Sequence, residues 1–307
     1  MDAKGTGQLV RHVLGAEPVR VEPMTFTHSG NTIFSVALDD GREVIVRMRG
    51  PDEDTFAHTE RHLRTLTDLG LPAPRLLAAD VTRTRFPFAY LILEKLPGRD
   101  LYYELPSMTR AGMSELAARI IEYQRRVATL PEGKGYGWGA IGEGGPEPSW
   151  LFCLTPGSTP PVVDPASPGG DFRRRLFDAQ VRLQPYFHTV RPTCFLEDLT
   201  TKNVLLENGE LTGLIDFDSV CFGDPLWQIG LAAGCVLNDV GEEFLFYTEE
   251  LCRIRGICGE RTAAVTFYAA ERATEFLEIA RDAGDTPTAE RLVPVIDRWL
   301  KTLEQAA

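Results

Sequence analysis

The stretch from Phe195 to Gly223 constrains the fold more than any other part of the chain. It reads FLEDLTTKNVLLENGELTGLIDFDSVCFG. Two short apolar runs, Val204–Leu206 and Leu211–Ile215, flank a turn that contains Asn208-Gly209. An Asn-Gly turn between two apolar runs predicts a β-hairpin, because both turn residues tolerate positive φ. We therefore expect a rigid hairpin with polar side chains at one rim.

Three oxygen-bearing side chains lie at the ends of this hairpin. Asp198 and Asn203 precede its first strand, with four residues between them, and Asp216 lies at the end of the second strand. Kinase catalytic loops carry an Asp, four residues and an Asn, with a second Asp after an apolar strand. Mg²⁺ prefers oxygen ligands of this kind. The spacing therefore favours a site for Mg²⁺ and a phosphoryl group.

The chain resembles the aminoglycoside phosphotransferase and choline kinase-like family, which shares the protein-kinase fold. The resemblance rests on the loop residues above, followed in order by Ile215-Asp216-Phe217 and Gly223-Asp224-Pro225. It implies an α+β, two-lobed protein-kinase-like fold. We expect a small antiparallel-sheet, nucleotide-binding lobe at residues 1–97. A larger, mainly helical, catalytic and substrate-binding lobe is expected at residues 98–307.

The resemblance also implies roles for individual residues. Asp198 would be the catalytic base that accepts the proton of an acceptor hydroxyl, while Asn203 and Asp216 would hold Mg²⁺. Asp224 would support the catalytic loop by accepting its backbone donors. One departure from the family is Leu196, which stands where the family has a His that packs and hydrogen-bonds beneath the loop. We expect this change to affect support of the loop and not the reaction.

The first lobe is predicted to begin with a helix at residues 6–15. Alternating apolar segments then predict an antiparallel meander at Val19–Met24, Ile33–Leu38 and Glu43–Met48, with a helix at Asp54–Leu69. In the family, a Gly-containing turn between the first two strands covers the ATP phosphates. Here that turn contains Ser29, Gly30 and Asn31.

Other ATP contacts follow from the same resemblance. Arg47, on the third strand, is expected to bind the ATP phosphates, with Arg49 as the alternative. Glu60 is the expected partner that fixes Arg47, unless it is an exposed helical Glu. The hinge backbone at Glu94, Lys95 and Leu96 is expected to hydrogen-bond the adenine edge.

The second lobe is predicted to be mostly helical, at 107–130, 171–186, 242–254, 261–283 and 289–303. A Gly- and Pro-rich loop spans 131–170, and such long loops are often functional. Its rings Tyr136, Trp138 and Trp150 either shape an acceptor pocket or pack the loop onto the lobe. Later in the chain, Glu271, Glu275 and Glu278 share one helical face, which is either solvated or attracts a cationic substrate.

Composition limits the partners. The formal net charge of −12 argues against nucleic acid and is compatible with a cationic acceptor. No apolar run is long enough to span a membrane, and the N-terminus lacks the apolar core of a signal peptide, so we expect a cytoplasmic protein without a membrane partner. The six cysteines form no C-x-x-C pair and are expected to be reduced thiols.

Together these observations predict an ATP- and Mg²⁺-dependent kinase, monomeric or homodimeric, that phosphorylates a hydroxyl of a small molecule. Aminoglycosides or other antibiotics, choline, amino sugars and hydroxy amino acids all remain open as acceptors. One alternative is a nucleotide-binding pseudokinase without transfer activity, which only Leu196 supports. A protein kinase is the other alternative. It is disfavoured because Gly223-Asp224-Pro225 follows Asp216 too closely to leave room for an activation loop.

Overall fold

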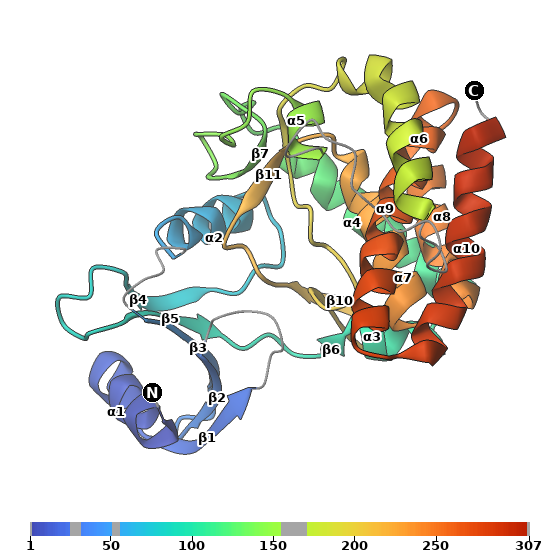
Figure 1. Ribbon diagram of the computed structural model, residues 1–307. Coiled ribbons are helices and arrows are strands. Elements are labelled where there is room, and N and C mark those ends of the chain that lie inside the picture. The colour runs from blue at the N-terminus through green and yellow to red at the C-terminus, as the bar shows by residue number, and fades with distance from the viewer. Residues whose placement is uncertain (1, 25–31, 51–55, 155–170, 306–307) are drawn as a thin grey trace. The chain divides into compact units, whose positions relative to one another are not determined.

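The computed structural model describes residues 2–24, 32–50, 56–154 and 171–305 of the chain. The chain divides into two compact units. The first comprises residues 1–98 with 212–219, and the second comprises 99–211 with 220–307. The first contains the larger antiparallel sheet and the second contains most of the helices (Figure 1). The expected α+β class is confirmed.

The first unit is built on a five-stranded sheet with strand order β1-β2-β3-β5-β4, in which all neighbours are antiparallel. Its elements are α1 (Ala3–Leu14), β1 (Pro18–Met24), β2 (Thr32–Leu38), β3 (Glu43–Arg49), α2 (Thr59–Asp68), β4 (Leu76–Asp80) and β5 (Ala89–Glu94). The predicted helix and three-stranded meander are therefore present. The helix begins where Asp2 accepts a hydrogen bond from the Gly5 N–H at 2.8 Å, which is the usual role of an N-cap Asp.

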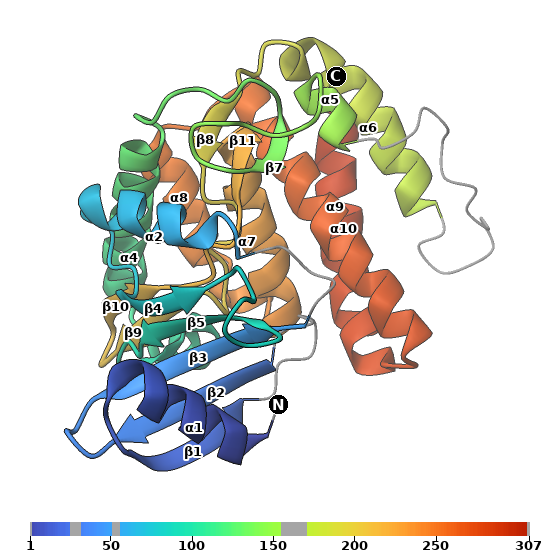
Figure 2. The ribbon, with the colours of Figure 1, turned by 90° about the vertical axis from the view of Figure 1, so that its left-hand side faces the viewer.

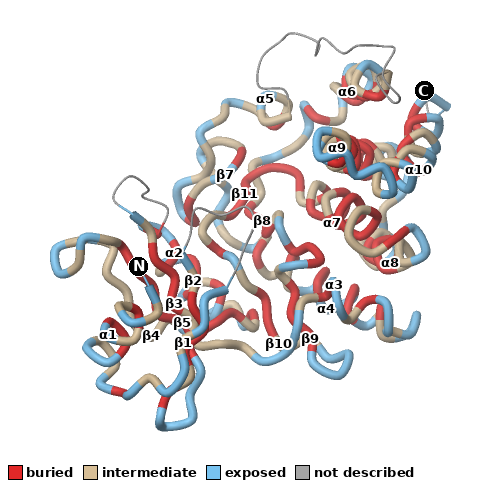
Figure 3. The backbone as a smooth tube through the Cα atoms, turned by 60° about the horizontal axis from the view of Figure 1, so that its bottom comes forward, coloured by how far each residue is buried: buried red, intermediate tan, exposed pale blue. Residues whose placement is uncertain are grey.

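One hydrophobic cluster of this unit lies between α1 and the sheet. Leu9 and Val10 of α1 are buried in one cluster with Val36, Val44 and Val46 of the central strands. Figure 3 shows the central strands largely buried. Each fully buried Val or Leu contributes roughly 1.5–3 kcal/mol, so this cluster anchors the strand that carries Arg47.

Helix α2 begins later than predicted. Residues 51–55 lie outside the described residues, residues 56–58 form a turn, and the helix starts at Thr59 instead of Asp54. Its buried residues are Thr59, His62, Leu63 and Leu66, which is the i, i+3, i+4, i+7 pattern of one helix face. This register decides which side chains of α2 reach the interior.

The second unit is a helical assembly (Figures 1 and 2). Its helices are α3 (Leu101–Glu104), the 3₁₀ helix η1 (Leu105–Ser107), α4 (Arg110–Val127), α5 (Trp150–Leu154), α6 (Phe172–Phe187), α7 (Leu226–Asp239), the 3₁₀ helix η2 (Glu242–Phe244), α8 (Phe246–Arg255), α9 (Glu260–Asp282) and α10 (Thr286–Gln305). Helix α9 packs against both α7 and α10, and α4 packs against α8. At Gly230 of α7, an added Cβ would lie 2.4 Å from the Cβ of Tyr268, so α7 and α9 approach too closely for any larger residue.

Two small three-stranded sheets have the strand orders β10-β9-β6 and β7-β11-β8. The strands are β6 (Arg99–Asp100), β7 (Gly137–Gly139), β8 (Thr193–Phe195), β9 (Val204–Glu207), β10 (Glu210–Leu214) and β11 (Val220–Gly223). Asn208 and Gly209 between β9 and β10 have φ values of 54° and 81°, so the predicted Asn-Gly turn is confirmed. Within the described residues, no helix is both long and apolar enough to cross a lipid bilayer.

Candidate active site

The predicted catalytic loop, residues 196–203, lies between β8 and β9. Asp198 is exposed, and its Oδ1 accepts a hydrogen bond from Thr200 Oγ1 at 2.9 Å. Asn203 Nδ2 donates to Asp198 Oδ2 at 2.7 Å and to the Asp198 carbonyl oxygen at 3.0 Å. The loop therefore brings Asp198 and Asn203 together. Both carboxylate oxygens of Asp198 are therefore held by hydrogen-bond donors of the same loop.

Two buried amide side chains hold the backbone around Asp198. Gln124 of α4 bonds to both the N–H and the carbonyl oxygen of Leu196. Gln228 of α7 donates to the carbonyl oxygen of Leu199 at 3.1 Å. The Leu196 side chain is itself buried in the apolar interior. Support for the loop thus comes from helices of the second unit and not from the side chain at position 196.

Asp224 has a different role from the one expected. Its Oδ2 accepts hydrogen bonds from the hydroxyls of Tyr186 at 2.8 Å and Tyr268 at 2.9 Å, and its Oδ1 accepts from the Leu226 N–H at 3.0 Å. Burial raises the pKa of Asp224, and these donors oppose the rise. The expectation that Asp224 accepts backbone donors of the catalytic loop is therefore wrong. It fixes the start of α7 against α6 and α9 instead.

A pocket of about 420 Å³ lies beside the catalytic loop in the second unit. It is lined by Asp100, Tyr102, Tyr103, Lys202, Asn238, Asp239 and Arg291. The pocket wall is joined to the loop at Thr201, whose hydroxyl donates to Asp239 and whose carbonyl oxygen accepts from the Tyr102 N–H at 2.8 Å. Its volume lies in the range of small-molecule sites, and its lining carries charges of both signs.

Arg47 lies on β3 of the first unit and is almost fully buried, with 9% of its side chain exposed. Its Nη2 lies 2.6 Å from Asp218 Oδ2 and 3.5 Å from Asp216 Oδ1, and its guanidinium lies 5.4 Å from the centre of the Phe56 ring. Its buried Nε has no hydrogen-bond partner in the described part of the chain. A buried guanidinium with one unused donor is suited to a further anion, as phosphate would be.

The expected pair between Arg47 and Glu60 does not form. Glu60 Oε1 instead lies 2.6 Å from Arg64 Nη2, one helical turn away on the surface of α2. The helix turns Thr59 and His62 inward, whereas Glu60 lies off that buried face. Glu60 thus lies at the surface of α2, as in the alternative of an exposed helical Glu, because Thr59, His62, Leu63 and Leu66 form the buried face.

The inward residues of α2 contact the segment that follows the hairpin. Thr59 Oγ1 donates to Asp218 Oδ1 at 3.1 Å. His62 Nδ1 donates to the Phe217 carbonyl oxygen at 2.9 Å, since a carbonyl can only accept. Thr59, His62 and Asp218 were not among the predicted site residues. The only local signal was the second acidic residue of Asp216-Phe217-Asp218.

Asp216 and Asn203 have suitable donor atoms for Mg²⁺. Asp216 has a positive φ of 66°, which is uncommon for a non-glycine residue, and 51% of its side chain is exposed. Desolvation by surrounding atoms raises the pKa of Asp216, and Arg47 opposes this rise. Asn203 points its Nδ2 at Asp198, which leaves its Oδ1 for a cation. No group of three or more His, Cys, Asp or Glu residues that would hold a metal by itself occurs in the described ranges.

Of the expected nucleotide contacts, Ser29, Gly30 and Asn31 lie outside the described residues. In the hinge, the Glu94 N–H donates to the Arg75 carbonyl oxygen at 2.9 Å, and the Lys95 N–H donates to the Glu43 carbonyl oxygen at 3.1 Å. The backbone N–H and C=O of Leu96 have no such bond within the described structure. The Leu96 backbone groups and the Lys95 carbonyl oxygen therefore have no backbone partner in the described part of the chain.

The three aromatic residues singled out in the long loop differ in their burial and in their hydrogen-bond partners. Trp150 is fully buried, and its Nε1 donates to the Tyr268 hydroxyl at 2.7 Å, so it packs the interior and does not line an acceptor site. Tyr136 donates its hydroxyl to the Val190 carbonyl oxygen at 3.0 Å. Trp138 stays about half exposed and donates to Glu197 at 2.8 Å.

The acidic face of α9 is not a simple solvated face. Glu275 lies 2.7 Å from Arg272, and Glu278 lies 2.6 Å from Arg173. Burial raises the pKa of Glu271 to about 7, the neighbouring Glu275 adds to the rise, and Arg173 and Arg272 oppose it. Most of the negative charge on this face is therefore already neutralised by arginines.

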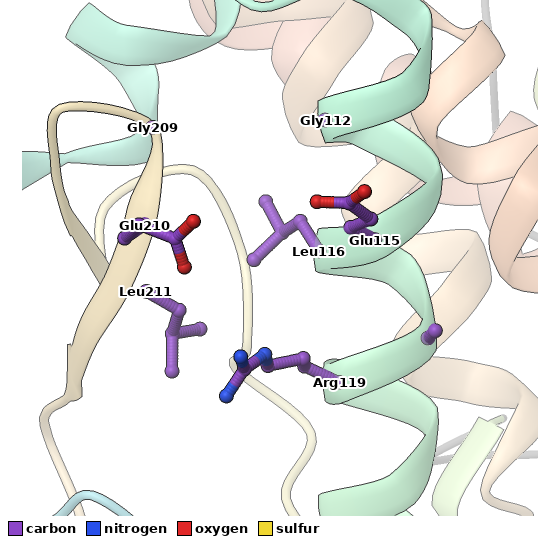
Figure 4. Close-up of a pocket in the computed structure, with 8 residues that line it drawn as sticks. Gly112, Glu115, Leu116, Arg119, Gly209, Glu210 and Leu211 are labelled. Atoms are coloured by element: carbon purple, nitrogen blue, oxygen red, sulfur yellow. The ribbon is translucent and has the colours of Figure 1, made fainter.

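A second groove, of about 310 Å³, lies between α4 and the hairpin. Figure 4 shows Glu115 of α4 and Glu210 of β10 pointing their carboxylates toward one another, with Arg119 below them. All three residues are exposed. Because solvent reaches these charges freely, this groove has the character of a hydrated surface, and we do not assign it to the reaction.

Comparisons with known proteins agree with this geometry. A family model described as the phosphotransferase enzyme family matches residues 28–251. No curated protein matches the chain in sequence. Among solved structures, the apo form of a thermostable mutant of aminoglycoside phosphotransferase APH(4)-Ia aligns with a TM-score of 0.69 at 16% identity, covering 96% of this chain and 98% of that one.

Two further structures extend the comparison. The GDP complex of wild-type aminoglycoside 2'-phosphotransferase-IIIa aligns with a TM-score of 0.64 at 14% identity, covering 98% of this chain and 99% of that chain. A putative fructosamine-3-kinase from Thermobifida fusca aligns with a TM-score of 0.60 at 14% identity, covering 98% of this chain and 100% of that one. At these identities the similarity shows the fold alone, and this fold is the expected protein-kinase-like one. Since the family model covers most of the chain, this protein belongs to the phosphotransferase enzyme family.

Proposed function

We propose that this phosphotransferase is an ATP-dependent small-molecule kinase, which transfers the γ-phosphoryl group to a hydroxyl of its acceptor. The observation that carries the proposal is the exposed Asp198 carboxylate, held by Thr200 and Asn203 on the loop of a family member. Asp198 orients the acceptor hydroxyl and takes its proton as the oxygen–phosphorus bond forms. Positioning and charge stabilisation provide most of the catalysis in such reactions.

The first unit is proposed to bind the nucleotide. Arg47 contributes its buried guanidinium to the phosphates, and Leu96 contributes backbone groups of the hinge to the base. Similar structures support nucleotide binding, since ternary complexes of the APH(4)-Ia mutants hold ADP or AMP-PNP with hygromycin B. The 2'-phosphotransferase-IIIa structure holds GDP, so ATP and GTP both belong in the assay.

Mg²⁺ is proposed as the cofactor, with Asn203 Oδ1 and the Asp216 carboxylate as its protein ligands. When bound, the ion neutralises charge on the phosphates during transfer. The hydrogen bond from Asn203 Nδ2 to Asp198 keeps the remaining amide oxygen oriented away from that carboxylate. About half of the Asp216 side chain is exposed.

The acceptor is proposed to enter the pocket beside the catalytic loop. Asp100 and Lys202 place opposite charges on its walls, and Tyr102 and Tyr103 add exposed rings. This lining suits a polar, hydroxylated molecule that carries an amine. Hygromycin B and kanamycin, which are bound in similar structures, are molecules of this kind, as is the fructosamine for which the similar Thermobifida fusca protein is named.

The test is Mg²⁺-dependent ADP release from ATP, measured against a panel of aminoglycosides, amino sugars, choline and hydroxy amino acids. Turnover is expected with at least one acceptor. Asp198→Ala should lower kcat by about 10²- to 10⁴-fold and leave ATP binding intact. The matched control is Glu115→Ala on the exposed groove, which should keep full activity.

Two results would contradict this assignment. Near-normal turnover by Asp198→Ala would remove Asp198 as the base. ATP binding with no ADP release toward any acceptor would instead favour the alternative, a nucleotide-binding module without transfer activity.

A further inference from the structure

Gln124 is the single polar side chain among the buried residues of α4. The others are Met113, Leu116, Ala117, Ile120, Ile121 and Val127, which form an apolar row along the helix. Gln124 is 2% exposed. Burying an amide is unfavourable unless its polar atoms find partners, so its presence in an apolar row requires a specific explanation.

The partner of this amide is the backbone of the catalytic loop. Gln124 Nε2 donates to the Leu196 carbonyl oxygen at 2.6 Å, and the Leu196 N–H donates to Gln124 Oε1 at 3.1 Å. Leu196 is 3% exposed, so both bonds are shielded from water. Since the N–H and the C=O belong to the peptide groups on the two sides of Leu196, the two bonds orient both groups.

The two hydrogen bonds between Gln124 and Leu196, called the anchor below, lie directly after the end of strand β8. Strand β8 stops at Phe195, and Asp198 follows three residues later in a turn. On the other side of Asp198, Gln228 Nε2 of α7 donates to the Leu199 carbonyl oxygen. The loop segment that carries Asp198 is therefore held at both ends by side-chain amides, one from α4 and one from α7.

We propose that Gln124 is a positioning residue for phosphoryl transfer, which sets the location of the Asp198 carboxylate through the backbone of Leu196. This inference rests on the proposed function, because Asp198 is the base of that reaction. Gln124 need not touch substrate or nucleotide. Reaction rates depend on placement of a catalytic group to within a fraction of an ångström, so loosening this anchor should slow the chemistry without weakening nucleotide binding.

The variant that tests the proposal is Gln124→Met, which keeps the length of the side chain and removes both hydrogen bonds. We expect kcat for ADP formation to fall by about 10- to 100-fold, while KM for MgATP stays within about twofold. The control is Met113→Ala, which disturbs the same buried row about three helical turns away. It should lose thermal stability and keep kcat within about twofold of the wild type.

A second readout does not depend on activity. Hydrogen–deuterium exchange of peptides that cover residues 195–203 should accelerate in Gln124→Met, because the Leu196 N–H loses its acceptor. Peptides from α9 and α10 should be unchanged. If Gln124→Met does not fold, Gln124→Asn serves instead: it keeps a polar amide but is one methylene too short to make both bonds.

The outcomes separate this inference from the proposed function. If the wild type releases no ADP with any acceptor, the proposed function fails, and exchange in 195–203 alone decides whether Gln124 holds the loop. Unchanged exchange in that segment overturns the inference. An unchanged kcat in a folded Gln124 variant also overturns the inference. The same holds if Met113→Ala loses as much kcat as Gln124→Met.

Discussion

Replacing Asp218 with Asn should destabilise the first unit by about 2 kcal/mol. In the structure, Asp218 Oδ2 lies 2.6 Å from Arg47 Nη2, and Asp218 Oδ1 accepts from Thr59 Oγ1 at 3.1 Å. The Arg47 side chain is 9% exposed and that of Asp218 is 18% exposed. The substitution keeps the shape of the side chain and removes its charge, so Arg47 loses its nearest counter-charge while it stays buried.

The size of this loss of stability depends on the contacts that Arg47 and Thr59 keep after the substitution. Breaking a fully buried ion pair costs about 3–5 kcal/mol, because the remaining charge is left uncompensated. Two features reduce this cost: Asp216 still provides a carboxylate 3.5 Å from Arg47, and an Asn at position 218 can still accept the hydrogen bond from Thr59. A loss of about 2 kcal/mol is therefore expected, rather than the full value.

Urea unfolding, followed by far-UV circular dichroism, measures this loss. The matched control is Asp40→Asn, which removes a pair with Arg42 at 2.6 Å, where both side chains are over 40% exposed. Solvent screens that pair, so its loss should change stability little. If Asp218→Asn costs no more than Asp40→Asn, the assignment of a buried, charge-dependent contact at Arg47 is refuted.

Two further predictions concern the second unit. Gly230→Ala should lower stability by about 1–3 kcal/mol although Ala favours helices, because its Cβ would lie 2.4 Å from the Cβ of Tyr268. Thermal denaturation should contrast it with Gly112→Ala, whose Cβ comes no closer than 3.5 Å to a neighbour; equal melting temperatures would contradict the close approach of α7 and α9. Glu271→Gln should stabilise the protein at pH 8 relative to the wild type, and much less at pH 5.5. Because the folded-state pKa of Glu271 is raised from 4.5 to about 7, its protonation stabilises the fold below pH 4.5, and this contribution is lost as pH rises through 7. Allowing for partial exposure, the difference at pH 8 is on the order of 1–2 kcal/mol, and melting temperatures that shift equally at both pH values would rule it out.

Much of the fold was predictable because its elements leave local patterns. The antiparallel meander, the Asn-Gly hairpin and the long helices all have periodicities that reflect which face is buried. The short strands β7, β8 and β11 were not predicted. Each has only three or four residues, and each is stabilised by pairing with segments far away in the chain.

The sequence by itself was enough to predict that Asp198 and Asn203 lie close together, because they are only five residues apart in one short loop. Only the tertiary structure decided what holds that loop and what faces Arg47. The anchor of the loop is Gln124, 72 residues from Leu196, and the partner of Arg47 is Asp218, 171 residues away. Local patterns record which face of a helix or strand is buried, whereas the partner of a buried polar group depends on how distant elements pack and on the register of each helix.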